Sequence, residues 1–146
     1  MPTSNKRSSK RAARAARPRK TRALPPLVDK LEHYNIVTDD FEVTAQFYEK
    51  IVGLTRGYRP NFAFPGAWLY AGPDPVVHLM ALGQTRPRGS GSIDHVAFRG
   101  SDYPRFVKHL GANAVPFRER VVPTTGMRQV FIEDPNGVTV EINFLK

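Results

Sequence analysis

The chain has 146 residues, a formal net charge of +9 and no cysteine. Its length fits one compact domain, and the lack of cysteine excludes disulfide frameworks, thiolate metal sites and a catalytic thiol. No run approaches the roughly 20 apolar residues of a membrane span, and the first residues lack the apolar core of a secretory signal. We therefore expect a cytoplasmic protein that has no membrane partner.

The positive charge is concentrated at the beginning of the chain. Residues 1–22 contain nine lysines and arginines and no acid, whereas the remainder contains 13 basic and 13 acidic residues. Because the first stretch has no large apolar side chains and leads into Leu24-Pro-Pro-Leu27, we predict that residues 1–26 form a basic disordered tail and a proline linker. Because the rest of the chain is formally neutral, we do not expect nucleic-acid binding as its function, apart from weak electrostatic contact through the tail.

Residues 27–146 are predicted to form a single domain in which one order of elements occurs twice. The first module, 30–82, has a strand near 30–37, a helix near 39–54, and strands near 56–60, 67–71 and 75–81. The second module, 92–146, has a strand near 92–98, a helix near 102–111, and strands near 114–119, 127–133 and 137–144. Aspartates begin both helices and a glycine ends each of them. This pattern indicates an α+β fold of two βαβββ modules.

Four side chains that could bind a metal fall at matching places in the two modules: His33, His78, His95 and Glu141. The two histidines of the first module are 45 residues apart, and His95 and Glu141 are 46 apart. Each lies in a short alternating segment that we read as a strand, so its side chain points away from its apolar neighbours. Four such residues could converge on one divalent ion, and nitrogen and oxygen donors suit Fe, Mn, Ni, Co or Zn. For any single histidine, a hydrogen-bonding role in a cavity is the alternative.

Other residues are candidates for substrate contact. Gln129 and Asn143 lie on the same face of the predicted strands as the predicted ligands. An aromatic wall against the substrate, or ordinary packing, would account equally well for Phe64, Trp68 and Tyr70. Arg118, Arg120 and Arg128 could bind an anionic group of the substrate, or they could be solvated residues at a strand edge. His109, on the second predicted helix, has no partner in register and is interpreted as a surface residue.

Four segments of the chain resemble the vicinal oxygen chelate superfamily, which includes glyoxalase I, fosfomycin and bleomycin resistance proteins, methylmalonyl-CoA epimerase and extradiol dioxygenases. The resemblance covers about residues 30–146. The segments are Leu31-Glu-His33, Gln46-Phe-Tyr-Glu49, Ile93-Asp-His95-Val-Ala-Phe98 and Gln129-Val-Phe-Ile-Glu-Asp-Pro-Asn-Gly-Val-Thr-Val-Glu141. The last is the most specific, because its Asp-Pro-Asn-Gly turn leads directly into the strand that carries Glu141.

The resemblance implies a cupped mixed sheet and metal ligands at His33, His95 and Glu141. His78 occupies a position where glyoxalase-type members carry Glu or Gln and dioxygenases have no ligand. The implied function is a divalent-metal lyase or isomerase that acts on a small molecule with vicinal oxygens, with Glu141 as catalytic base. One alternative is an Fe(II) extradiol dioxygenase in which His78 is not a ligand, and another is a metal-free binding protein of the bleomycin-resistance kind. A homodimer is expected, and the sequence leaves open whether the site lies within one chain or is shared.

Overall fold

The computed structural model describes residues 27–28, 30–84 and 86–145. It divides the chain into a unit Met1–Lys30 and a unit Leu31–Lys146, and the fold and the candidate site belong to the second unit. The predicted basic tail of residues 1–26 lies outside the described residues. Within the described part of the chain, no helix has the length and apolar composition needed to cross a membrane.

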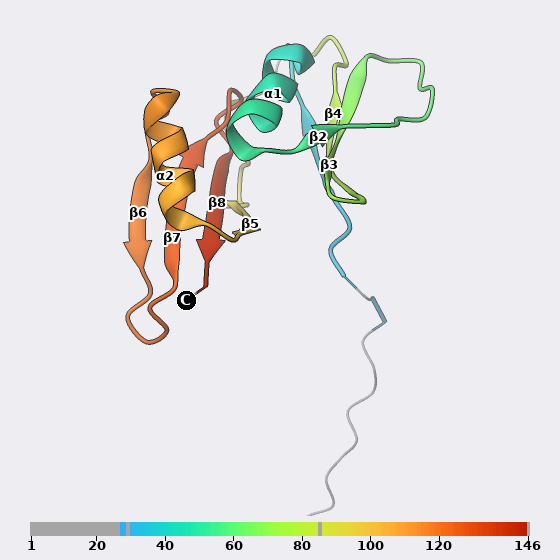
Figure 1. Ribbon diagram of the computed structural model, residues 1–146. Helices are drawn as coiled ribbons and strands as arrows, with labels where there is room; N and C mark the ends of the chain where they lie inside the picture. Colours follow the sequence, from blue (N-terminus) through green and yellow to red (C-terminus); the bar gives the residue numbers. More distant parts are fainter. Residues whose placement is uncertain (1–26, 29, 85, 146) are drawn as a thin grey trace, which may run out of the picture. The chain divides into compact units, whose positions relative to one another are not determined.

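Two four-stranded sheets with the same strand order form the second unit (Figure 1). The first sheet has the order β1-β4-β3-β2, formed by β1 (Tyr34–Val37), β4 (Asp74–Met80), β3 (Gly66–Ala71) and β2 (Thr55–Arg56). The second has the order β5-β8-β7-β6, formed by β5 (Val96–Gly100), β8 (Thr139–Phe144), β7 (Arg128–Glu133) and β6 (Arg118–Val121). In each sheet the first and last strands of the module are parallel and the other pairs are antiparallel. The predicted α+β fold of two βαβββ modules is confirmed.

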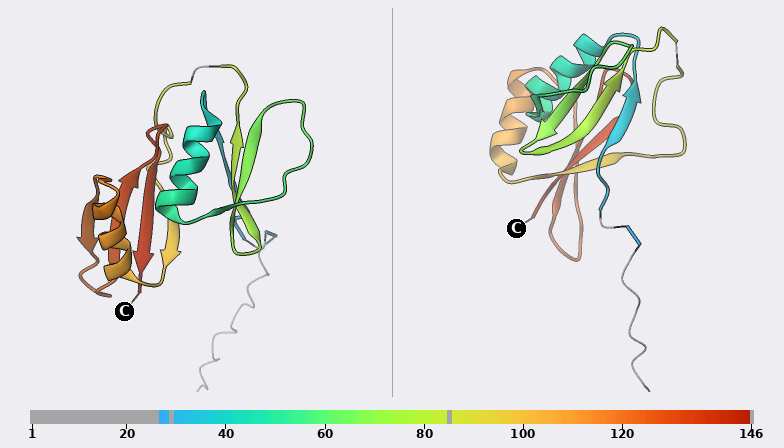
Figure 2. Two further views of the ribbon diagram at one scale, coloured as in Figure 1. Left: turned by 45° about the horizontal axis from the view of Figure 1, so that its top comes forward. Right: turned by 90° about the vertical axis from the view of Figure 1, so that its right-hand side faces the viewer.

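A helix follows the first strand of each module. Helix α1 (Phe41–Phe47) continues directly into the π-helix η1 (Tyr48–Val52), and α2 (Tyr103–Ala112) is the helix of the second module. Figures 1 and 2 show α2 lying against one face of the second sheet. The helix predicted near 39–54 is present as α1 and η1, and its last turn is a π-helix. There the Gly53 N–H bonds to the carbonyl of Tyr48, five residues back, and Gly53 takes a left-handed φ of +87° that ends the helix.

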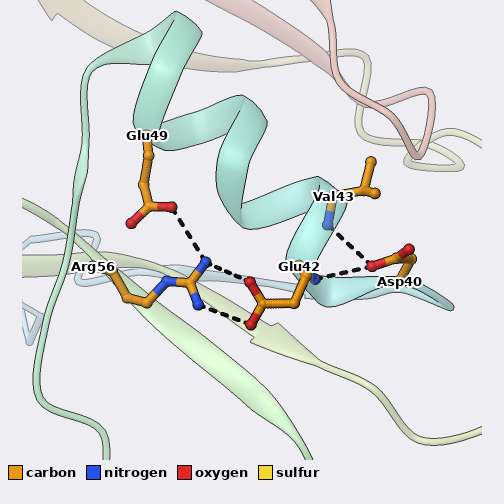
Figure 3. A network of polar contacts seen from close by, with 5 residues as sticks. All are labelled: Asp40, Glu42, Val43, Glu49 and Arg56. Carbon is orange, nitrogen blue, oxygen red and sulfur yellow. Dashed lines mark hydrogen bonds and ion pairs between the residues drawn. The ribbon is translucent and has the colours of Figure 1, made fainter.

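Polar side chains fix the start of α1 and tie strand β2 to it (Figure 3). The Asp40 carboxylate accepts hydrogen bonds from the backbone N–H groups of Glu42 and Val43, at 3.1 and 3.0 Å, and so caps the helix. Arg56 on β2 donates two hydrogen bonds of 2.9 Å to the Glu42 carboxylate and one of 3.2 Å to Glu49. The short strand β2 is thereby held against the helical segment as well as against β3.

Each sheet has one apolar face, which packs into the core, and one face that carries polar side chains. The buried strand residues alternate as the pattern predicted: Ile36, Ala67, Leu69, Val77 and Leu79 in the first module, and Val130, Ile132, Val140, Ile142 and Phe144 in the second. Together with residues of the helices they form one hydrophobic cluster. Because side chains alternate along a strand, the residues between these positions lie on the opposite face of each sheet, here termed the open face.

Buried polar contacts join α1 and η1 of the first module to a turn of the second. The fully buried Tyr48 hydroxyl donates to Asp134 Oδ2 at 3.1 Å and accepts from the Tyr34 hydroxyl at 3.2 Å. Asn136 Nδ2 donates to Thr44 Oγ1 at 3.0 Å. The turn 134–137 joins β7 to β8, and Gly137 adopts the φ of +80° that it requires. The module contact therefore also fixes the start of β8, the strand that carries Glu141.

Replacing Tyr48 by phenylalanine should lower the free energy of unfolding by about 1–3 kcal/mol, because the buried Asp134 carboxylate loses a donor and the Tyr34 hydroxyl loses its acceptor. Urea unfolding followed by Trp68 fluorescence measures the change. Tyr34→Phe is the matched control and should cost less, since the Tyr48 bond to Asp134 remains. Equal stability of Tyr48→Phe and the parent protein would contradict this role.

Candidate metal centre

The pairing of parallel strands places two candidate donors together in each module. In the first module Asn35 on β1 is the partner of His78 on β4, and in the second Ala97 on β5 is the partner of Glu141 on β8. His33 lies two residues before Asn35, and His95 lies two residues before Ala97. The offset is therefore identical in the two halves. His33 and His95 were expected within strands, but β1 and β5 begin one residue after them, at Tyr34 and Val96.

In the first module, His78 lies between two aromatic rings. Its ring stacks on His33 with centroids 3.8 Å apart and on Trp68 with centroids 4.0 Å apart, and the planes differ by 20° and 3°. Trp68 is the β3 residue directly opposite His78 in the antiparallel pair β3–β4. The Nε2 atom of His78 is buried and, among the described residues, has no hydrogen-bond partner. An unpartnered buried nitrogen is costly, so this atom is suited to a ligand that supplies the missing contact.

The surroundings of His78 favour its neutral form. Burial lowers the pKa of His78 below its ordinary value, and the neighbouring His33 lowers it further. A neutral imidazole nitrogen is the form that binds a metal ion. His33 precedes β1, its side chain is 34% exposed, and its Nδ1 lies 3.2 Å from Glu32 Oε2.

In the second module, a buried carboxylate lies between an imidazole and an amide. Glu141 is 3% exposed, and its Oε2 is 2.8 Å from His95 Nε2. Its other oxygen, Oε1, accepts a 2.6 Å hydrogen bond from Gln129 Nε2. On the far side of the imidazole, His95 Nδ1 is 2.7 Å from Asp94 Oδ2. Such outer partners orient metal-binding side chains in known sites. The sequence reasoning missed Asp94, although its position next to His95 was a signal.

The four donors form two pairs rather than one cluster. His33 and His78 belong to the first module, and His95 and Glu141 to the second. No three His, Asp or Glu side chains in the described part of the chain are grouped so that they could hold one ion. Two cavities of about 560 Å³ each are lined by residues of both modules and by none of the four donors. Metal binding by all four thus stays a prediction, and within one chain the four side chains are arranged as two separate pairs.

The other predicted site residues fall into two groups. Gln129 and Asn143 lie beside Glu141 on the open face of the second sheet, joined by a hydrogen bond of 3.2 Å. The aromatic residues are beside His78 on the first sheet: Phe62 is tilted against Trp68 at 6.3 Å and stacked on Phe64 at 5.4 Å. The Arg59 guanidinium, which the sequence did not single out, lies over both phenylalanine rings. These rings and Trp68 continue the series of ring contacts that begins at His33, with one tilted contact between Trp68 and Phe62.

Two further expectations have clear outcomes. Tyr70 alternates with Trp68 along β3 as predicted, and its hydroxyl donates to the carbonyl of Tyr58 at 2.7 Å, which ties it to the preceding loop. His109 was interpreted as a surface residue without a counterpart in register, and its side chain makes a contact that was not predicted. Its Nε2 lies 2.7 Å from the Lys50 carbonyl oxygen, and the residue is half-buried between the modules. No sequence pattern indicated this contact, because it depends on how η1 and α2 pack.

Comparison with known proteins identifies the family. Residues 30–142 match the Glyoxalase/Bleomycin resistance protein/Dioxygenase superfamily, and the chain belongs to that superfamily. The family resemblance inferred from the sequence motifs is thereby confirmed. The superfamily includes glyoxalase I enzymes, and its members commonly use divalent metals.

Individual relatives are distant. The Arabidopsis thaliana protein named Glyoxylase I 4 is 25% identical, with 77% of this chain and 68% of the relative covered. The crystal structure of lactoylglutathione lyase from Agrobacterium tumefaciens superposes with a TM-score of 0.63 at 18% identity, covering 82% of this chain and 96% of the other. The fosfomycin resistance protein FosX from Listeria monocytogenes gives a TM-score of 0.64 at 15% identity, covering 82% and 96%. At these identities the structural likeness establishes the fold.

Replacing Trp68 by leucine should raise the pKa of His78 toward the ordinary value of about 6.5, because the imidazole then regains water on one face. An NMR pH titration of the His78 ring in metal-free protein measures the shift. Phe62→Leu is the control, since Phe62 contacts Trp68 but makes no ring contact with His78. A His78 midpoint that is the same in Trp68→Leu and the parent protein would contradict the role of stacking.

Proposed function

We propose that the protein is a divalent-metal-dependent enzyme that acts on a small molecule with two adjacent oxygen atoms, as a lyase or isomerase of the glyoxalase-like kind. One observation carries the proposal. In both modules the strand register places the first histidine at the same position relative to a second donor. The second donor of the first module, His78, has a buried Nε2 atom with no hydrogen-bond partner among the described residues. Membership of a superfamily that includes glyoxalase I enzymes supports the same reading.

The donor set fits a divalent transition metal. His33, His78, His95 and Glu141 would hold it through three imidazole nitrogens and a carboxylate, a combination suited to Fe, Mn, Ni, Co or Zn. With four protein ligands, a six-coordinate ion has about two positions left for vicinal substrate oxygens. When bound, such an ion polarises a substrate carbonyl or hydroxyl and stabilises the negative charge that develops beside it.

The chain's own residues would prepare this chemistry. The hydrogen bond from Gln129 keeps one oxygen of the Glu141 carboxylate in place, and Asp94 sets the orientation of the His95 ring. Trp68 limits rotation of His78 by stacking on it. Glu141 would give up its contact with the ion to act as the base and take a proton from the carbon next to the substrate carbonyl, because a carboxylate beside the reacting centre can accept that proton and later return it.

A second copy of the chain would complete the site. Each donor pair belongs to a different sheet, and the described residues of one chain do not bring the pairs into one group. In a homodimer, the pair His33 and His78 of one protomer can face the pair His95 and Glu141 of its partner. This arrangement supplies four ligands and also covers both open faces, which would exclude water from the reacting atoms.

Protein purified without a histidine tag should contain close to one divalent ion per chain by elemental analysis. A double variant His95→Ala/Glu141→Met should contain almost none, because it removes one complete donor pair. His109→Asn is the matched control, since His109 contacts Lys50 and no donor, and it should retain the metal. Circular dichroism verifies that each variant is folded. A parent protein that binds no ion would contradict the proposal and favour the metal-free binding function.

The dioxygenase alternative differs in ligand number. An extradiol dioxygenase holds both catechol oxygens and O₂ and therefore needs about three open positions, which leaves His78 outside the coordination sphere. Iron-loaded protein that converts catechols aerobically to a yellow ring-fission product would favour this alternative. The unpartnered Nε2 of His78 favours the four-ligand arrangement, because that atom would then acquire a contact.

A further inference from the structure

The open face of the second sheet is arranged in two neighbouring rows. Strand register places the row of the metal donors across four strands, in the order Arg118, Phe131, Glu141 and Ala97. Two residues further along each strand, the next row on the same face has the order Arg120, Gln129, Asn143 and Arg99. The spacing of alternate residues puts the second row about 7 Å from the first. A cationic and amide-bearing row therefore lies beside the proposed metal donors.

The amides of this row have orientations that the Glu141 carboxylate imposes. A carboxylate only accepts hydrogen bonds, so the Gln129 side chain must present its NH₂ group to Glu141, as it does at 2.6 Å. The same NH₂ group donates to Asn143 Oδ1 at 3.2 Å. Asn143 must then direct its own NH₂ group away from Gln129. Asn143 is only half-buried, so two N–H donors are available above the sheet.

Two arginines flank the amides and have no anionic partner among the described residues. Arg120 is the strand partner of Gln129 and Arg99 is the strand partner of Asn143, so both side chains leave the sheet on the open face. Both are exposed, and neither forms an ion pair or side-chain hydrogen bond with any described residue. The Asn143 amide within the row and the two guanidinium groups at its ends offer hydrogen-bond donors on the same face of the sheet.

Unlike Arg99 and Arg120, the nearby Arg118 and Arg128 place their guanidinium groups over aromatic rings. Arg118 lies over the Phe131 ring, with its guanidinium carbon 4.7 Å from the ring centroid. Arg128 was a sequence candidate for binding an anion, but its guanidinium lies over Tyr103, a residue of α2 on the core side of the sheet. The sequence grouped Arg118, Arg120 and Arg128, whereas strand register selects Arg120 and adds Arg99.

We propose that Arg99, Arg120 and the Asn143 amide bind an anionic group of the substrate, a carboxylate or a phosphate-type group, about one strand repeat from the metal donors. The inference rests on the proposed function, because it assigns the substrate of that same site to the class of anions with vicinal oxygens. Guanidinium groups suit such ligands, since their planar N–H donors match two oxygens of a carboxylate or phosphate. The only carboxylate in the two rows, Glu141, is engaged by Gln129 and His95.

The first test uses the full chain without metal and inorganic phosphate as the probe. Titration at low salt should shift the Asn143 side-chain amide resonances saturably, and Arg99→Met/Arg120→Met should weaken the affinity about tenfold or more. Arg128→Met is the matched control on the same sheet and should leave the affinity unchanged. A side-chain reporter is needed because residues 1–22 hold nine cations that attract phosphate without specificity. Absence of a saturable shift, or equal affinity in the double variant, would overturn the proposal.

The second test separates this proposal from the proposed function. Calorimetry with metal-loaded protein compares 3-(3,4-dihydroxyphenyl)propionate with its amide, two catechols of similar shape whose side chains end in a carboxylate and in a neutral carboxamide. We expect the anion to bind about tenfold more tightly to the parent protein, and this preference to vanish in Arg99→Met/Arg120→Met while the amide binds as before. Equal binding of both compounds would reject the anion site alone. Phosphate binding without metal uptake would reject the metal-dependent function and leave the anion site standing.

Discussion

The structure depends on the register between the first and last strands of each module. Pairing of β1 with β4 places Asn35, two residues after His33, opposite His78. Pairing of β5 with β8 places Ala97, two residues after His95, opposite Glu141. Because the strands are parallel, each pair requires a crossover, and α1 with η1, or α2, supplies it. A slip of one residue in either pair would turn the second donor into the core. Helices, turns and core packing all serve to hold this register.

The two modules use the same positions with different chemistry. The residue opposite the second donor on the antiparallel neighbour is aromatic in both: Trp68 faces His78, and Phe131 faces Glu141. Trp68 stacks flat on the imidazole it faces, whereas Phe131 meets His95 edge-on at 6.0 Å. A ring can cover a neutral imidazole, but a buried carboxylate needs donors, and Gln129 provides one. The duplication thus yields one pair in aromatic surroundings and one pair in polar surroundings.

Much of the fold follows from local patterns in the sequence. Alternation of apolar residues located the inner strands β3, β4, β7 and β8, and the Asp134-Pro-Asn-Gly137 turn predicted how β8 begins, because both depend on neighbours in the chain. The edge strands predicted near 56–60 and 114–119 lie instead at Thr55–Arg56 and Arg118–Val121. The arrangement of the modules does not follow from such patterns. It rests on the contact of Tyr48 with Asp134, residues 86 positions apart, and on the contact of His109 with Lys50, residues 59 positions apart. For this reason the sequence predicted four donors but not their division into two pairs. It also could not separate Arg120 from Arg128, which differ in facing opposite sides of one sheet.

The central claim is that each module builds one half of a metal site and that two copies of the chain complete it. Co-expression of His33→Ala/His78→Ala with His95→Ala/Glu141→Met, each with a different non-histidine tag, allows the mixed dimer to be isolated through both tags. Such a dimer retains one intact pair of each kind, on different chains. Elemental analysis should find one divalent ion per mixed dimer and none in either variant alone. A mixed dimer without metal, alongside a parent protein that binds it, would contradict the account and place the complete site within one chain.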